Sequence, residues 1–347
     1  MKYSVILKTC RKEPKFEWFF DSYYNEIKNK TQEFELIIID SELWYNFEER
    51  SNYVKKLINN RFNYIHSEPK PTNWQGPHKK TKYNYFDAAN SVNTGLILCN
   101  GDYVIFFDDC TLLTPGVIDY HIFASENEMC GSGTYLYVND LKVKNGISTD
   151  FILGSSNLLH DTQKNLHGSK RADWCDIKLS PLKIGGGWWM GSNSSAYFTS
   201  LLECNGSDEF TARYGCEDID LGCRLFNHKN NLQRFPMAFI FESSVDNDRE
   251  KSGYENFPVR CFSKDRMYDE SFNKLCIDKF HEIYYKENGG TPTPSCEGSI
   301  KRINGVNLPW CKFNLKDARD YYLINKKFLP ANPITHCPFS NLPIEEI

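Results

Sequence analysis

The first 108 residues alternate short apolar runs with helix-length segments, and this pattern strongly limits the possible folds. The apolar runs have the length of strands and lie at residues 4–7, 36–39, 64–66 and 103–107. Between them, residues 16–27, 47–57 and 87–98 have the spacing or length of helices, and Asp87 is a suitable N-cap. Strands separated by helices in this way are typical of βαβ units. The sequence therefore predicts an α/β fold with a mostly parallel sheet.

Carboxylates follow two of these predicted strands. Asp40 closes the run at 36–39, and Asp108 and Asp109 follow the run at 103–107. An unpaired carboxylate in an apolar core is costly, so we expect these side chains at the edge of the sheet. Open parallel sheets bind their ligands at the carboxyl ends of the strands. The three acids therefore predict a ligand site there.

A second acidic cluster lies further along the chain. Glu217, Asp218 and Asp220 begin a predicted helix at 216–226, which precedes an apolar run at 238–241. By themselves, acids at a helix N-terminus are explained by the helix dipole. Together with Asp108 and Asp109 they suggest two halves of one site, in which one half holds a divalent cation and the other supplies a base.

Composition narrows the class of protein further. The 347 residues suffice for one large domain or two ordinary ones, and the net charge of −4 argues against a general polyanion-binding surface. The 13 cysteines are scattered and odd in number, without a C-x-x-C pair, so we expect free thiols in a reducing cytoplasm. No signal-like start and no run of about 20 apolar residues is present, so no membrane span is predicted.

The order of the motifs resembles GT-A fold glycosyltransferases, and most closely their inverting family 2 group. The resemblance runs from about residue 2 to 241 and includes Asn93-Thr94-Gly95, Asp108-Asp109 as the "DXD" acids, and the Glu-Asp-x-Asp-Leu stretch at 217–221. It implies a Rossmann-like sheet flanked by helices in a catalytic domain at 1–246. Residues 247–347 would form a mostly helical or irregular extension packed on that domain.

By this resemblance the donor is a nucleotide sugar, taken to be a UDP-sugar. The residues expected to bind it are Thr9, Asp40, Lys80, Asn93 and Asp108. Mn²⁺ or Mg²⁺ would neutralise the departing diphosphate as a Lewis acid, and such hard cations prefer carboxylate oxygens. Asp109 is the expected metal ligand, and Glu242 and Asp246 are equal candidates for a further one.

The acceptor side of the site is expected from the second half of the chain. Asp218 matches the family base, and Glu217 would hold an acceptor hydroxyl or orient the helix. Trp188 and Trp189 follow three glycines, and one of the two is expected to stack on an acceptor sugar, although tryptophan is more often a core residue. The acceptor itself stays open among a glycan, a lipid-linked glycan and a protein. The acidic net charge weighs against nucleic acid, but the basic cluster at 78–82 keeps that class open.

Three departures from the family pattern affect the phosphate and metal sites. Cys110 stands at the third DXD position, Val92 replaces an Arg that many relatives have, and no His follows the run at 238–241. A thiol is a poor ligand for a hard cation. Lys79, Lys80 or Lys82 could supply the missing phosphate charge instead.

Two other functions remain open from the sequence. The departures just named would suit a catalytically silent nucleotide- or sugar-binding module. A GT-A-like nucleotidyltransferase is a third possibility, but residues 8–12 lack the glycines of its phosphate loop. The sequence leaves the donor sugar and the oligomeric state open.

Overall fold

The structure is a computed structural model of the 347-residue chain. It describes residues 1–9, 11, 14–44, 46–70, 78–79, 88–138, 182–186, 189, 191–207, 217–229, 231–243, 314–329 and 345–346.

A parallel half-sheet forms from the N-terminal third of the chain. Its strands are β1 (Lys2–Thr9), β2 (Glu33–Asp40), β3 (Tyr64–Ser67) and β5 (Tyr103–Asp108), in the order β3-β2-β1-β5. All three pairings are parallel. This is the topology that the alternation of apolar runs predicts.

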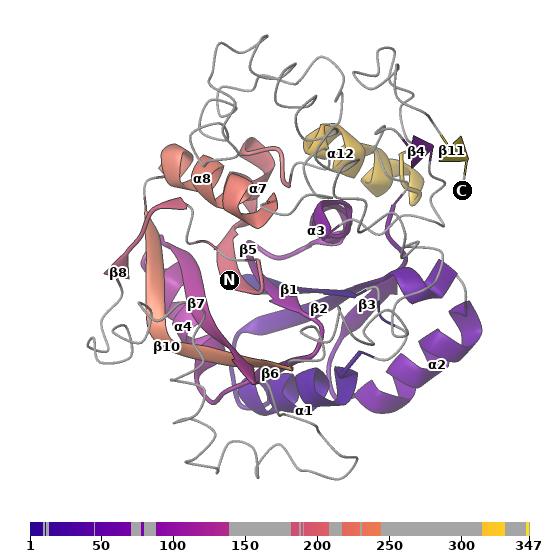
Figure 1. Ribbon diagram of the computed structural model, residues 1–347, viewed down its shortest axis with the longest axis horizontal. Helices are drawn as coiled ribbons and strands as arrows, with labels where there is room; N and C mark the ends of the chain where they lie inside the picture. The colour runs from indigo at the N-terminus through magenta and orange to yellow at the C-terminus, as the bar shows by residue number, and fades with distance from the viewer. Residues whose placement is uncertain are drawn as a thin grey trace.

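Later strands extend the sheet beyond β5 (Figure 1). They are β9 (Asn193–Tyr197), β7 (Cys130–Val138), β10 (Leu232–Ser243), β6 (Thr111–Leu113) and β8 (Leu182–Lys183). Strand β9 is antiparallel to both β5 and β7, β10 is parallel to β7, and β6 and β8 are antiparallel to β10. Six of the nine strands described in this sheet therefore run in one direction. A separate short pair joins β4 (His78–Lys79) to β11 (Glu345–Glu346).

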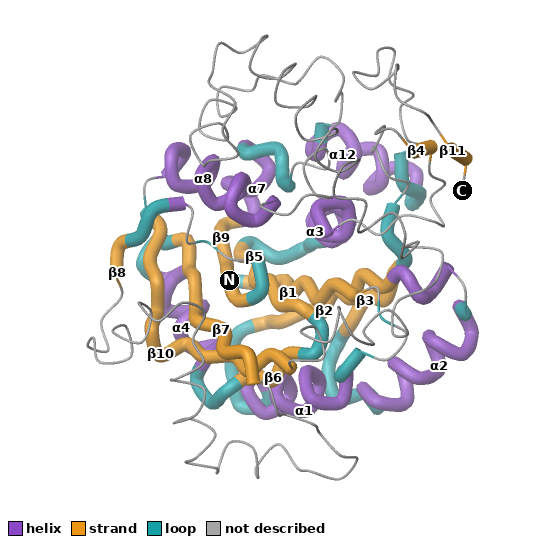
Figure 2. The backbone as a smooth tube through the Cα atoms, viewed as in Figure 1, coloured by secondary structure: helices purple, strands orange, loops and turns teal. Residues whose placement is uncertain are grey.

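Helices cover both faces of the sheet, as Figure 2 shows. One face carries α1 (Phe16–Ile27), α2 (Phe47–Ile58) and α4 (Val117–Glu126). The other carries α3 (Ala88–Leu98), α7 (Phe198–Glu203), α8 (Glu217–Lys229) and α12 (Leu315–Asn325). A short 3₁₀ turn, η1 (Ser41–Trp44), follows β2.

The alternation of side chains along β1 explains why both faces are covered. Val5 and Leu7 belong to the core under α1, α2 and α4, whereas Ile6 belongs to the core under α3 and α8. All three are essentially unexposed. Successive strand residues point to opposite faces, so a run that is apolar at every position must be buried on both sides.

The described part of the C-terminal region packs on α3. Leu315 and Ala318 of α12 are buried in the same core as Leu96. Arg319 donates from Nη1 to the backbone oxygen of Ile97 at 2.7 Å. The boundary between a catalytic domain at 1–246 and an extension at 247–347 stays a prediction.

The predicted α/β fold with a mostly parallel sheet flanked by helices is confirmed. Within the predicted extension, α12 ends at Asn325 because the chain turns at Lys326, whose φ of 54° is left-handed. Sequence patterns did not predict α4 or β9. In the part of the chain that the structure describes, no helix is long and apolar enough to cross a membrane.

Candidate functional site

Strand register brings the predicted acids to one edge of the sheet. In the parallel pairings, Thr9 of β1 lies opposite Asp40 of β2, and Lys8 lies opposite Asp108 of β5. The carboxyl ends of three neighbouring strands are therefore level. Polar side chains can be held there because the sheet ends and its apolar core does not continue.

Asp109 is held by two side chains, one from the last residue of β1 and one from the segment after it. The Thr9 hydroxyl donates to Asp109 Oδ2 at 2.5 Å, and Arg11 Nε lies 3.1 Å from Oδ1 and 3.0 Å from Oδ2. The backbone N–H of Arg11 also donates to the Thr9 hydroxyl, which closes this small network. Thr9 thus orients the predicted metal ligand.

Asp108 forms an ion pair with Lys8. The Asp108 side chain keeps 37% of its surface exposed, while the Lys8 side chain keeps only 12%. The more accessible of the two DXD carboxylates is thus paired with an ammonium group that is itself largely enclosed by protein.

Cys110 occupies the third DXD position as a turn residue. Its φ of 58° is left-handed, and only 4% of its surface is exposed. The residue turns the chain from β5 into β6, and its side chain is buried. This position therefore adds no hard donor to the two carboxylates before it.

Asp218 contacts Gly191, which lies close to Lys8, the partner of Asp108. The Gly191 N–H donates to Asp218 Oδ2 at 3.2 Å. A Cβ placed on Gly191 would lie 4.0 Å from that oxygen and 3.9 Å from Lys8 Nζ. The Lys8 ammonium and the Asp218 carboxylate therefore flank the same small space beside Gly191. The two acidic clusters of the sequence converge there.

Glycines on both sides permit this close approach of α8. A Cβ on Gly222 would lie 2.3 Å from the Gly186 oxygen, and a Cβ on Gly186 would lie 2.3 Å from Cys223 Cα. Real Cβ atoms do not approach backbone atoms so closely. The segment around Gly186 therefore packs directly on the backbone of α8, one turn after Asp218.

Trp189 is a core residue in this structure. Its side chain is 1% exposed, its ring meets Phe106 edge-on at 5.6 Å, and its Nε1 donates to the Ser195 oxygen at 3.5 Å. An enclosed indole cannot stack on an acceptor sugar, so the structure assigns this Trp to packing. Trp188, the other expected acceptor contact, lies outside the described residues.

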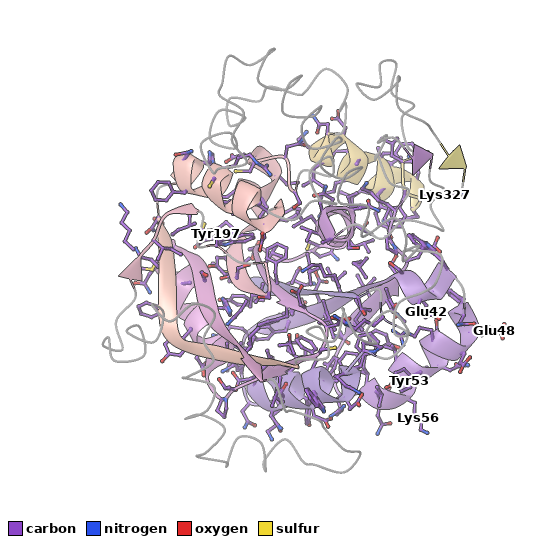
Figure 3. All side chains as sticks on the ribbon, in the orientation of Figure 1. Glu42, Glu48, Tyr53, Lys56, Tyr197 and Lys327 are labelled. Carbon is purple, nitrogen blue, oxygen red and sulfur yellow. The ribbon has the colours of Figure 1, made fainter. Side chains whose placement is uncertain are left out.

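Asp40 lies at the expected edge but is fully buried. Arg50 Nε donates to Asp40 Oδ2 at 2.7 Å, His66 Nε2 lies 3.1 Å from the same oxygen, and the Glu42 N–H donates to Oδ1 at 3.0 Å. Both oxygens are therefore held by protein groups. Glu42, marked in Figure 3 after the end of β2, is buried as well.

Asn93 lies inside the molecule and joins α3 to the turn after α7. Its Nδ2 donates to the Ser207 oxygen at 2.7 Å, and the Ser207 N–H donates to its Oδ1 at 2.8 Å. The side chain has no exposed surface and stabilises this contact.

The remaining predicted residues are located only in part. Register pairs Glu242 of β10 with Thr111, two residues after Asp109, so the backbone of this candidate metal ligand lies close to the first acidic cluster. Glu217 begins α8. Lys80 and Asp246 lie outside the described residues.

Two basic residues and one glycine of the site were not predicted as binding residues. Lys8, Arg11 and Gly191 lie next to predicted residues in sequence or in space. A basic residue at the end of a strand is a weak cue by itself. Only the register of β1 against β5 shows that Lys8 faces an acid.

The side chains at this site are suitable in part as ligands for a hard divalent cation. Asp108 and Asp109 supply carboxylate oxygens, the ligand type that Mg²⁺ and Mn²⁺ prefer, and substrate phosphates commonly complete such sites. Among the residues that the structure describes, no three His, Cys, Asp or Glu side chains gather as a ready metal site. Each of the two carboxylates is also engaged by a basic side chain of β1 or the segment after it.

No protein-family model and no curated protein matches the chain. Solved structures do match it. S. aureus TarS 1–349 is 14% identical with a TM-score of 0.49, over 93% of this chain and 87% of that one. The mannosyltransferase PcManGT from Pyrobaculum calidifontis, in complex with GDP-Man and Mn²⁺, is 14% identical with a TM-score of 0.43, over 95% and 76%.

A third similar structure is the glucosyl-3-phosphoglycerate synthase of Mycobacterium tuberculosis with Mn²⁺, UDP-Glc and phosphoglyceric acid. It is 13% identical with a TM-score of 0.40, over 78% of this chain and 81% of that one. Against TarS 1–349 in complex with UDP-GlcNAc, this chain spans 58% of the matched chain's length. The matched structures thus include a mannosyltransferase and a glucosyl-3-phosphoglycerate synthase. Because these TM-scores are below 0.5, the function proposed below rests on this chain's own geometry.

Proposed function

We propose that this chain is a glycosyltransferase that moves a sugar from a nucleotide donor to an acceptor hydroxyl with inversion. The convergence of Asp108 and Asp109 with Asp218 around Lys8 and Gly191 is the observation that supports it most. For direct displacement, the diphosphate site and the base must be separated by about the width of the one sugar that is transferred. The preference for a UDP-sugar follows from the motif resemblance.

Asp218 is proposed as the general base. As the acceptor oxygen attacks the anomeric carbon, its proton passes to the Asp218 carboxylate, and the bond from that carbon to the diphosphate breaks. The Gly191 N–H holds one oxygen of Asp218 at 3.2 Å and so limits the rotation of the carboxylate. Proton transfer of this kind contributes a factor of about 10²–10⁴ in rate. Glu217, one residue earlier, is proposed to hold the acceptor.

Asp109 and Asp108 are proposed to hold Mn²⁺ or Mg²⁺ on the donor side, with Glu242 or Asp246 as a further ligand. When bound, the ion would neutralise the diphosphate as a Lewis acid. Thr9 and Arg11 keep the Asp109 carboxylate in one orientation, so this metal ligand is already oriented before the donor binds.

The base assignment is tested by Asp218→Asn. UDP release is measured with a panel of UDP-sugars, acceptors and Mn²⁺, and transfer is expected to fall by about 10²–10⁴ while UDP binding persists. Asp119→Asn is the matched control, because that carboxylate is 64% exposed on α4, away from the site. Full transfer by Asp218→Asn would show that another group is the base.

The metal assignment is tested by Asp109→Ala in the same assay. Transfer is expected to be lost and Mn²⁺ binding to weaken. Wild-type-like transfer by this variant contradicts the assignment.

A catalytically silent binding module is the second candidate. The engagement of both DXD carboxylates by Lys8 and Arg11 favours it, because such pairs can be purely structural. Calorimetry that detects UDP binding, with no turnover for any donor and acceptor of the panel, would favour this candidate over the transferase.

A further inference from the structure

We infer that Lys8 is a built-in cation of the donor site, which competes with a divalent metal ion for Asp108 and adds affinity for the nucleotide diphosphate. The inference rests on the proposed function for the identity of the ligand. Lys8 thereby gains a binding role in addition to its ion pair with Asp108.

Strand pairing and an ion pair together place the Lys8 ammonium in the site. Lys8 and Asp108 are register partners on adjacent parallel strands, and their side chains form an ion pair. Only 12% of the Lys8 side chain is exposed. An ammonium so enclosed is held by the charges around it, because burial without compensation is costly.

Lys8 also faces the second acidic cluster. Its Nζ and Asp218 Oδ2 lie 3.9 and 4.0 Å from the same point beside Gly191. The ammonium therefore contacts Asp108, proposed as a metal ligand, and lies near Asp218, proposed as the base. A diphosphate bound at this edge of the sheet would approach three carboxylates, of which Asp108 is paired with Lys8 and Asp109 with Arg11.

The Lys8 ammonium has opposite effects on the binding of a divalent cation and on the binding of a diphosphate. A divalent cation on Asp108 must share that carboxylate with an ammonium of the same sign, so Lys8 weakens metal binding in the absence of nucleotide. A diphosphate is attracted by the ammonium, so Lys8 strengthens nucleotide binding. Removal of the charge should therefore move the two affinities in opposite directions.

Lys8→Met is the decisive variant, because it keeps the length of the side chain and removes its charge. We expect Mn²⁺ to bind the nucleotide-free variant about tenfold more tightly, and UDP in the presence of EDTA to bind it about tenfold more weakly. Mn²⁺ affinity is read from the free-ion electron paramagnetic resonance signal and UDP affinity from calorimetry. Local damage to the site would weaken both.

Two further variants control the measurement. Lys2→Met removes a charge at the other end of β1, where Lys2 pairs with Glu33 and Glu35, and should change neither affinity. Lys8→Arg keeps the charge and should keep Mn²⁺ binding weak. Urea unfolding of each variant checks that the fold is intact.

The inference is overturned if Lys8→Met binds Mn²⁺ no more tightly than the wild type, or UDP no more weakly. Neither measurement requires turnover. A chain that releases no UDP from any donor therefore contradicts the proposed transferase, whereas these affinities decide the role of Lys8 separately.

Discussion

The charge on Asp40 is held entirely inside the protein. Its carboxylate has no exposed surface, and the Arg50 side chain that contacts it is 5% exposed. Arg50 also donates from Nη2 to the backbone oxygen of Arg11 at 2.8 Å, which links the end of β2 to the segment that holds Asp109. The main effect of Asp40 is therefore structural, because through Arg50 it stabilises the segment that contains Arg11.

Asp40→Asn is expected to lower the free energy of unfolding by about 3–5 kcal/mol, because it removes the countercharge from a buried guanidinium. Urea unfolding measures the loss. Asp21→Asn is the matched control, since the Asp21–Arg61 pair is 48% and 24% exposed and should contribute about 1 kcal/mol or less. Equal losses in both variants would contradict the distinction.

His121 makes the stability of the fold depend on pH. It is fully buried, its Nδ1 lies 2.7 Å from Ser195 Oγ, and its Nε2 lies 2.9 Å from Asn193 Oδ1. Burial lowers the pKa of His121 to about 4, although the hydrogen bond to Asn193 opposes the shift. The unfolded chain, with a His pKa of about 6.5, therefore takes up a proton more readily as the pH falls.

The stability that neutral His121 contributes is thus complete above about pH 6.5 and is lost between about pH 6.5 and 4. From pH 7 to pH 5 this group should account for a loss of about 2 kcal/mol in the free energy of unfolding. His121→Gln should lose correspondingly less over the same interval in urea titrations. An identical pH dependence in both proteins would show that His121 is not the titrating group.

At the scale of elements, α8 and the segment around Gly186 position Asp218. Gly222 and Gly186 bring two backbones together where any side chain would collide. Gly222 lies four residues after Asp218, so both are on the same face of α8. A change at Gly222 is therefore transmitted to the proposed base.

Gly222→Ala is expected to destabilise the protein by about 1–3 kcal/mol, because the new methyl group would lie 2.3 Å from a backbone oxygen and 2.6 Å from Trp189 Cβ. It should also reduce transfer by at least about tenfold, since Asp218 moves with the helix. Gly185→Ala is the control, because a Cβ there meets no atom within 4 Å. Thermal unfolding and UDP release are the measurements, and similar behaviour of the two variants would refute this packing.

At the scale of the whole molecule, α12 shares a core with the sheet. Leu315 is fully buried among residues that include Leu96 and Leu201, and Arg319 lies over the Phe198 ring at 4.6 Å. Residues more than 200 positions apart therefore complete one hydrophobic layer. This contact predicts that α12 and the sheet unfold together.

Leu315→Ala should cost about 2–5 kcal/mol, the usual range for a truncated core leucine. Unfolding followed by fluorescence and by circular dichroism should still show one coincident transition. Leu323→Ala, at a position that is 42% exposed, should change stability little. Early, separate loss of the helix signal in Leu315→Ala would mean that α12 is not part of the cooperative core.

Local patterns were sufficient for most of the N-terminal half of the fold. Phe16–Ile27 has the predicted bounds of α1, and the four apolar runs became β1, β2, β3 and β5. Strand β9 was missed because its residues, Asn-Ser-Ser-Ala-Tyr, carry no apolar alternation. Its backbone pairing with β5 and β7 stabilises it as a strand, and pairing partners are not visible in a single segment.

The chemistry of the candidate site was predictable only where it depends on residue type. Acids after apolar strands are costly unless they lie at a sheet edge, so Asp108 and Asp109 could be singled out from their positions in the chain, whereas Asp218 was singled out by the family resemblance. Their convergence was a tertiary result: strand register set Lys8 against Asp108, and contact between two glycines brought α8 and Asp218 to Gly191. Tertiary packing also enclosed Asp40, Asn93 and Trp189, of which the first two were expected donor contacts and the third was one of two candidate acceptor contacts. Residue type determines what a side chain can bind, whereas exposure and partners depend on segments far away in the chain, and no local pattern encodes them.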